Sequence, residues 1–236
     1  MRTLGVLFLG LTFFSFPLSS ARADELSVAQ LKAEILRLAK SYEGKGDPDQ
    51  SLQKTLDVLV AKLVAKAPMP PVNERISLVA GVWKQVWGPY DYRDDKGGID
   101  PTLGFREIYQ VVFADGYYYN VAPYFPGGDP TKEKIGYLRG EFELDPLNKN
   151  GLRVRFTRYP GVDTRPSKLN LWELPALSEA GKVENEITLV PTPVVVATFK
   201  GGTLDEVYTD EQLRLVYGTS FKPNARRSLY VMRRIE

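Results

Sequence analysis

The spacing of the apolar residues changes once along this chain, near residue 78. Before that point, apolar residues recur at every third or fourth position, which is the spacing of one helix face. After it, they alternate with polar residues, which is typical of half-buried β-strands joined by Pro- and Gly-rich turns. The change predicts a mainly β (α+β) protein in which a short helical segment precedes a long antiparallel β-rich body.

The first 23 residues have the three parts of a secretory signal peptide. Arg2 supplies a basic start, residues 3–17 are almost wholly apolar, and a cleavage site of small residues ends at Ala23. The apolar run is shorter than the roughly 20 residues that a membrane-spanning helix needs. We therefore expect a signal peptide at 1–23 and no transmembrane segment after its cleavage, with an uncleaved N-terminal anchor as the alternative.

Two helices are predicted directly after the signal peptide. Each carries one apolar stripe at helical spacing, made of Val28, Leu31, Ile35, Leu38 and Tyr42 in the first and of Leu52, Leu56, Leu59 and Leu63 in the second. Ser27 and Gln30 have the spacing of a capping box. Asp47 predicts the cap of the second helix, with Pro48 at its first position and Gln50 reaching back to the cap.

A single β domain is expected from 72 to 236, after the helical hairpin at 24–71. Its roughly ten short runs either stack as a sandwich or close into an up-and-down barrel, and we expect a closed barrel of about 8–10 strands. The strands expected in its second half are 169–174, 186–192, 194–199, 203–208, 212–217 and 229–235.

Two hairpins are predicted within the first half of this domain. Asp115-Gly116, between two alternating aromatic runs, is a strong signal for a tight turn. In the next hairpin, Glu141 and Arg155 stand at alternating positions of neighbouring strands. If those strands pair, the glutamates and arginines become cross-strand partners on an outer face.

The composition excludes several classes of site. The chain has no Cys and no His, which excludes disulfides, thiol nucleophiles, His-dependent catalytic triads and metal ligation by these residues. The 31 basic side chains fall to 29, equal to the acidic ones, once the two arginines of the signal peptide are removed. A neutral mature chain does not favour nucleic acid as a partner. Export without cysteine fits a periplasm or an equivalent extracytoplasmic compartment.

Two motifs give the chain a family resemblance. The first is Gly81-Val82-Trp83 at the start of the first strand, a tripeptide that opens lipocalin-like barrels. The second is Asp210 with Leu213-Arg214, followed by a final apolar strand. Taken in order with the helical hairpin, these elements resemble the plastid lipid-associated protein/fibrillin (PAP/fibrillin) family.

The resemblance implies a lipocalin-like barrel that binds lipids, isoprenoids, carotenoids or quinones without a catalytic step. It also implies that Gly81 and Trp83 close one end of the barrel, with an Arg from the last strand packed over the Trp ring. Arg233 and Arg226 are the two candidates for that role, and the sequence does not distinguish between them. Because the family is best known from plastids and cyanobacteria, the thylakoid lumen is a further possible location.

Aromatic and branched side chains on the expected inner faces are the candidate ligand contacts. They are Trp83, Tyr109, Val111, Phe113, Tyr117, Tyr119, Phe142 and Phe156. For each of them, a plain place in the barrel core is the alternative. Tyr118 is expected on the opposite, outer face, where an exposed ring would contact a membrane surface or a partner.

We therefore expect an exported, non-enzymatic protein that carries one hydrophobic small molecule and needs no metal or cofactor. An isomerase or cyclase acting on an apolar substrate is one alternative. A protein-interaction module with a filled barrel is another, in which Val60 and Val64 of the hairpin would form the contact surface.

Overall fold

The computed structural model describes residues 26–42, 47, 49–88, 108–124, 131, 134–156, 161–163, 201–221 and 224–235. The helices are α2 (Val28–Ser41), α3 (Ser51–Lys66), the 3-10 turn η1 (Val72–Glu74) and α4 (Ile76–Val79). The strands are β1 (Gly81–Trp87), β2 (Tyr109–Phe113), β3 (Tyr117–Tyr124), β4 (Lys134–Leu144), β5 (Gly151–Phe156), β6 (Gly161–Asp163), β7 (Gly202–Thr209), β8 (Leu213–Ser220) and β9 (Ser228–Arg234).

The predicted helical hairpin is confirmed, and its two helices begin in different ways. The capping box of α2 forms as expected, since the Ser27 hydroxyl accepts from the backbone N–H of Gln30 and the Gln30 side chain accepts from that of Ser27. The predicted start of α3 is three positions too early. Gln50 is left-handed, with φ of 61°, and it caps no N–H with its side chain. The Asp47 carboxylate still caps the helix, because it accepts from the N–H groups of Leu52 and Gln53 at 3.2 and 2.9 Å.

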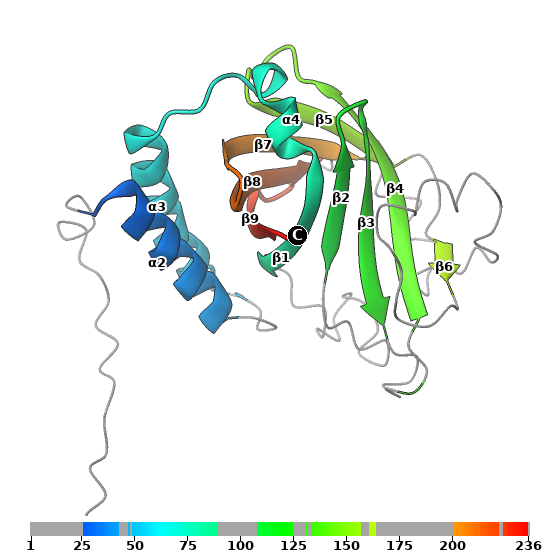
Figure 1. Cartoon of the computed structure of the whole chain (residues 1–236), viewed down its shortest axis with the longest axis horizontal. Helices are drawn as coiled ribbons and strands as arrows, with labels where there is room; N and C mark the ends of the chain where they lie inside the picture. Colours follow the sequence, from blue (N-terminus) through cyan, green and yellow to red (C-terminus); the bar gives the residue numbers. More distant parts are fainter. Residues whose placement is uncertain are drawn as a thin grey trace, which may run out of the picture.

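Eight strands form a closed antiparallel barrel, which confirms the expected fold (Figure 1). Each described strand pairs with its neighbour in the chain from β1 through β5 and from β7 to β9. Pairing of β5 with β7 and of β1 with β9 completes the circle, while β6 adds a short pairing to β4. Because a closed barrel leaves no free edge among these eight strands, backbone hydrogen bonds run around its whole wall.

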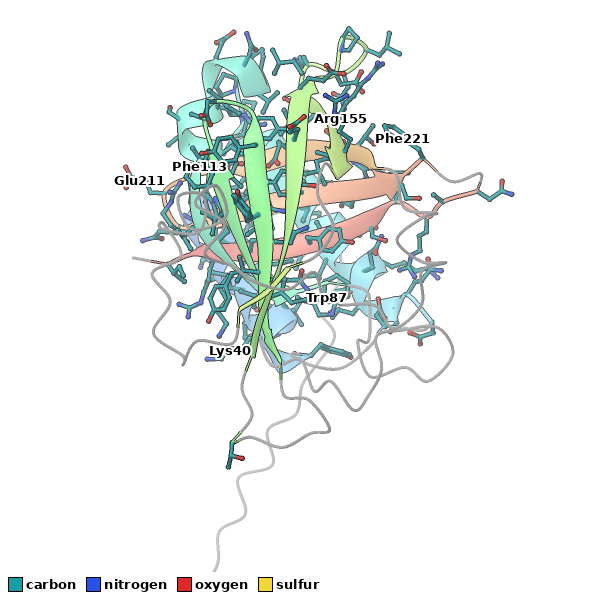
Figure 2. The ribbon with its side chains drawn as sticks, turned by 90° about the vertical axis from the view of Figure 1, so that its right-hand side faces the viewer. Lys40, Trp87, Phe113, Arg155, Glu211 and Phe221 are labelled. Atoms are coloured by element: carbon teal, nitrogen blue, oxygen red, sulfur yellow. The ribbon has the colours of Figure 1, made fainter. Side chains whose placement is uncertain are left out.

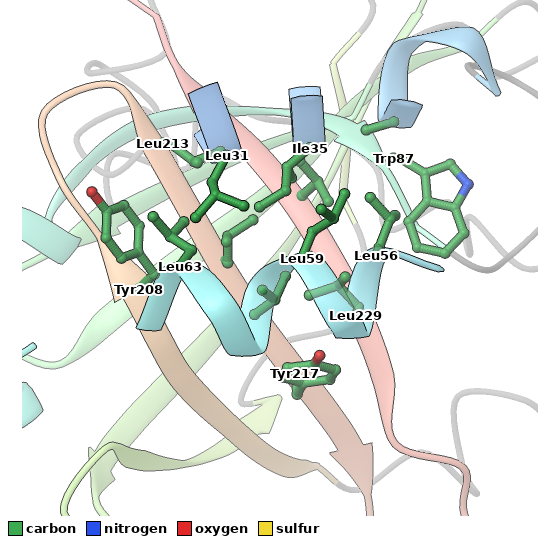
Figure 3. Close-up of a cluster of buried hydrophobic side chains, with 14 of the residues drawn as sticks. Leu31, Ile35, Leu56, Leu59, Leu63, Trp87, Tyr208, Leu213, Tyr217 and Leu229 are labelled. Carbon is green, nitrogen blue, oxygen red and sulfur yellow. The ribbon is translucent and has the colours of Figure 1, made fainter. Parts of the chain in front are cut away.

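The helical hairpin packs on the outside of the barrel, over β1, β7, β8 and β9 (Figures 1 and 3). Leu56 and Leu63 of α3 meet Leu215 and Val231 of the strands in one buried cluster. Val60 belongs to this cluster and is 3% exposed, and Val64 packs against it. The expectation that Val60 and Val64 form an exposed contact surface is therefore wrong.

The predicted turn and the predicted strands can be checked wherever they fall in the described part of the chain. The turn at Asp115-Gly116 is confirmed, with Phe113 opposite Tyr117. The last three expected strands are confirmed with ends shifted by one to three residues. The strands expected at 169–174, 186–192 and 194–199 lie outside the described residues, as does the expected signal peptide.

The charged outer face expected on β4 and β5 is confirmed. Glu141 stands opposite Arg155, and Glu143 stands opposite Arg153. Arg155 and Glu141 form an exposed ion pair at 3.1 Å, and Figure 2 shows Arg155 at the surface of the barrel. This row of charges fixes the pairing register, since a shift of one residue would carry every charge to the inner face.

The two ends of the barrel differ. At one end, η1 and α4 lead directly into β1, and the backbone N–H of Val72 donates to Lys149 in the turn between β4 and β5 (Figure 1). Trp87, the last residue of β1, lies toward the other end, well away from Phe113 (Figure 2).

Among the described helices, none is long and apolar enough to cross a membrane.

Candidate functional site

The barrel interior is identified by a cluster to which all eight strands contribute side chains. Trp83, Val112, Tyr118, Phe142, Leu152, Leu204, Val216 and Met232 come one from each strand, and Val72, Ile76 and Val79 join them from η1 and α4. A cluster shared by strands on every side of a barrel can only be its inner filling. The short helices therefore close one end of the interior, which we call the plugged end.

Trp83 is the centre of the plugged end. Its side chain is 0% exposed, and its indole N–H donates to the carbonyl oxygen of Val79 at 2.8 Å. The guanidinium of Arg234 stacks over the ring, 4.3 Å from its centroid, and donates to the carbonyl oxygens of Ala80 and Leu78. The indole and the guanidinium together close this end of the barrel.

Gly81 makes room for that guanidinium. Its φ is +144°, and a Cβ there would lie 2.1 Å from Nη1 of Arg234. The expected close approach at Gly81 is thus confirmed, but the assignment of Arg233 or Arg226 is wrong. Arg233 is exposed and stands opposite Lys84 in the pairing of β1 with β9, and Arg226 donates to the Gln53 side chain.

A buried ion pair lies beside the indole. Arg214 and Glu206 are 1% and 0% exposed, and two guanidinium nitrogens of Arg214 donate to the two carboxylate oxygens of Glu206. The Arg214 guanidinium also lies 5.9 Å from the Trp83 ring and 3.7 Å from the sulfur of Met232. Such a bidentate pair compensates both charges only while both partners are present.

A second buried guanidinium ties the linker to the barrel. Arg75 is 2% exposed and donates to the carbonyl oxygens of Pro70 and Glu206 and to the hydroxyl of Thr209. Burial lowers the pKa of Arg75, and the Glu206 charge opposes that shift. The buried polar groups therefore hold the segment before β1 against β7, where it covers the plugged end.

Two amides extend this polar network along the inner face. Nη1 of Arg214 donates to Oε1 of Gln110, and Nε2 of Gln110 donates to Oδ1 of Asn120 at 3.0 Å. Gln110 shares the inner face of β2 with Val112, and Asn120 shares that of β3 with Tyr118. A polar chain thus runs from the buried ion pair to the wall of β3.

Solvent exposure changes along the interior. Trp83, Arg214 and Glu206 at the plugged end are fully buried. Toward the other end, inward side chains keep partial exposure; they include Gln110, Asn120, Leu204 and Tyr230. We call this second part the open half, because the side chains that point into it are partly exposed.

The residues predicted to line the barrel divide between two faces. Trp83 and Phe142 belong to the inner cluster. Phe156 pairs with Gly140 at the end of β5, but its side chain lies outside the described part of the chain. The remaining predicted residues are Tyr109, Val111, Phe113, Tyr117 and Tyr119, which form a separate cluster on the opposite face of the strands with Val82, Val121 and Ile235.

The prediction that these five residues line the barrel is therefore wrong, and so is the outer position predicted for Tyr118. Tyr118 is 3% exposed and points inward, where Gly140 leaves space for its ring. A Cβ on Gly140 would lie 2.4 Å from the Tyr118 ring, so the cross-strand glycine is required. Burial raises the pKa of the Tyr118 hydroxyl, against the opposing charge of Arg214.

The C-terminal motif has a structural basis. The Asp210 carboxylate accepts from the backbone N–H groups of Gln212 and Leu213 and forms an ion pair with Lys32 of α2 at 2.5 Å. Leu213 is buried under the hairpin, and Arg214 points the other way into the ion pair. The motif thus joins the hairpin, the β7–β8 turn and the barrel interior.

Sequence reasoning missed Glu206, Gln110 and Asn120 as site residues. Glu206 directly follows Asp205 in a strand that also contains Thr203 and Thr209, so its sequence context did not single it out as a buried carboxylate. The two amides carried no signal either, because Gln and Asn on a strand are usually solvated.

The comparisons with known proteins assign no family to this chain. No protein-family model matches it, and no curated protein matches it.

Proposed function

We propose that this protein is an exported carrier or scaffold that holds one hydrophobic small molecule in the open half of its barrel. The ligand class is a lipid, an isoprenoid, a carotenoid or a quinone, and the protein performs no catalytic step on it. The location is a periplasm or an equivalent extracytoplasmic compartment, with peripheral contact to a membrane where the ligand is exchanged.

The observation that carries the proposal is the contrast between the two ends of the interior. If the interior side chains only stabilised the fold, they would be buried throughout the barrel. Here Trp83, Arg214 and Glu206 are fully buried, whereas Leu204 and Tyr230, which also point inward, remain partly exposed. An interior that is plugged at one end and partly exposed toward the other is suited to receive a ligand.

The size of the barrel limits the ligand. An eight-stranded barrel is just wide enough to be filled by side chains or to hold one small ligand. Because the plugged end already contains an indole and two guanidiniums, the ligand must be a single narrow apolar molecule or one chain of a larger lipid. The resemblance to the PAP/fibrillin family supports the same ligand class.

Mass spectrometry of the purified protein tests the proposal. The mature chain, residues 24–236, is exported from a lipid-rich host, purified without detergent, and measured both natively and after organic extraction. We expect one apolar molecule per chain. A clean apo mass, with no uptake of added apolar ligands, would refute the carrier function.

Two matched variants locate the molecule within the barrel. Leu204 points inward and Thr203, its neighbour on β7, points outward; both are partly exposed. Leu204→Trp fills the open half and is expected to abolish the copurifying mass. Thr203→Trp adds the same ring outside and is expected to retain it. Equal retention in both variants would place the ligand elsewhere.

A further inference from the structure

The buried guanidinium of Arg214 fixes the orientation of the two inward amides. A guanidinium has N–H donors and no acceptor, so the Gln110 atom that faces it is the carbonyl oxygen. The amide nitrogen of Gln110 then points away from Arg214 and donates to Asn120. The atom of Asn120 that receives this bond is its carbonyl oxygen, because the Gln110 nitrogen donates and therefore needs an acceptor.

The series of hydrogen bonds that begins at Arg214 ends at the amide nitrogen of Asn120. This nitrogen carries two N–H donors, and it donates no hydrogen bond among the described residues, while the Oδ1 atom accepts from Gln110. Asn120 is partly buried, points inward, and stands where the plugged end gives way to the open half. A group entering the open half therefore meets N–H donors at its inner limit.

The charges behind these amides favour the same kind of group. The charged side chains buried in the described part of the barrel are Arg75, Arg214 and Glu206, two guanidiniums against one carboxylate. Among these buried charges, the Arg214 guanidinium is the one that contacts the amides, and it favours an oxygen that carries negative or partial negative charge. An ammonium group would meet repulsion from Arg214, and the Oδ1 atom of Asn120 already accepts one hydrogen bond, from Gln110.

We propose that Asn120 anchors the polar end of the ligand by donating to a carbonyl or carboxylate oxygen. This rests on the proposed function, and adds that the bound molecule is an apolar body with a hydrogen-bond acceptor at the end that enters first. Gln110 is a positioning residue, since it holds the Asn120 amide in its donating orientation. Pure hydrocarbons and amines are the poorer ligands.

Equilibrium dialysis with three naphthalene probes tests the inference. The probes are 2-methyl-1,4-naphthoquinone, which has neutral carbonyl oxygens, 2-naphthoate, which has a carboxylate, and 2-methylnaphthalene, which has no oxygen. The wild-type protein is expected to bind at least one oxygen-bearing probe about fivefold more tightly than the hydrocarbon, the equivalent of one hydrogen bond. The stronger of the two oxygen probes distinguishes a carbonyl ligand from a carboxylate.

Three variants complete the experiment. Asn120→Leu removes the donor and is expected to abolish the preference while it leaves hydrocarbon affinity unchanged. Asn120→Asp has nearly the same shape and still accepts from Gln110, but presents oxygen where the amide had N–H, so it is expected to bind both oxygen-bearing probes at least fivefold more weakly than the wild type. Asn73→Asp makes the same chemical change at an exposed position and is expected to bind as the wild type does.

The outcomes distinguish a failure of the Asn120 anchor from a failure of the carrier function. The role of Asn120 is overturned if Asn120→Leu still prefers the oxygen-bearing probes. It is also overturned if the wild type binds the hydrocarbon but shows no such preference. In both cases the carrier function still stands. Failure of the wild type to bind any of the three probes counts against the carrier function itself, and the anchor falls with it.

Discussion

Replacement of Trp83 by Ala is expected to destabilise the barrel by about 4 kcal/mol. Truncation of a fully buried Trp or Phe to Ala costs about 3–5 kcal/mol, and this side chain is 0% exposed. The hydrogen bond to the Val79 carbonyl oxygen and the stacking of Arg234 are lost with the ring. For a domain of this size, such a loss lowers the melting temperature by about 8–16 °C.

Urea denaturation followed by far-ultraviolet circular dichroism measures this change. Phe221→Ala is the matched control, because that ring is 60% exposed and its removal is expected to change the free energy of unfolding by less than about 0.5 kcal/mol. If Trp83→Ala unfolded within about 1 kcal/mol of the wild type, Trp83 would not be a buried plug.

A double-mutant cycle isolates the stacking contribution within that loss. Trp83→Leu and Arg234→Met are made singly and together, and their interaction energy is expected to be about 0.5–2 kcal/mol, the range for a guanidinium over an indole. An interaction energy near zero would show that Arg234 acts only through its bonds to the carbonyl oxygens of Ala80 and Leu78.

Three further predictions concern the other buried polar groups. Glu206→Gln leaves Arg214 buried without its carboxylate and is expected to cost about 3–5 kcal/mol in urea denaturation, so a neutral effect would contradict the ion pair. Asp47→Ala removes the acceptor for two N–H groups of α3 and is expected to cost about 1 kcal/mol in the same assay. Burial disfavours the charge of Asp210, but Lys32 and the turn N–H groups outweigh it and lower the pKa of this carboxyl. The charged carboxylate therefore stabilises the fold above about pH 4, and this stabilisation is lost as the pH falls through the lowered pKa. Asp210→Asn should reduce the loss of unfolding free energy at acid pH. An unchanged pH profile would refute the role of Asp210.

The sequence predicts elements best where only one face of a strand or helix is apolar. The apolar stripe that contains Ile35 correctly predicted the buried face of its helix. The alternation of Glu141 with apolar residues correctly predicted how β4 and β5 pair. On β3 the same reasoning failed, because Tyr118 and Tyr119 are 3% and 1% exposed although they point to opposite faces. Alternation cannot identify the inner face of a strand whose two faces are both buried.

Bulges explain why the remaining positions could not be assigned by counting. Trp83 and Trp87 are an even number of residues apart, yet a register shift between Gln85 and Trp87 sends Trp83 inward and Trp87 under the hairpin. A second shift on β7, between Glu206 and Tyr208, separates those residues in the same way. No residue pattern in the chain marks either shift, and each reverses the faces of every residue beyond it.

These bulges also join the barrel interior to the hairpin. At each bulge, residues two to four positions apart reach the plugged end on one side and the hairpin core on the other, as Glu206 and Tyr208 do. Tyr208 donates to Asp210 at 2.8 Å, and Asp210 in turn pairs with Lys32 of α2. Through these contacts β7 is fastened to α2 outside the barrel, two residues from the carboxylate that pairs with Arg214. The hairpin thus covers the end of β1 together with β7, β8 and β9, and these last three strands carry Glu206, Arg214 and Arg234 at the plugged end.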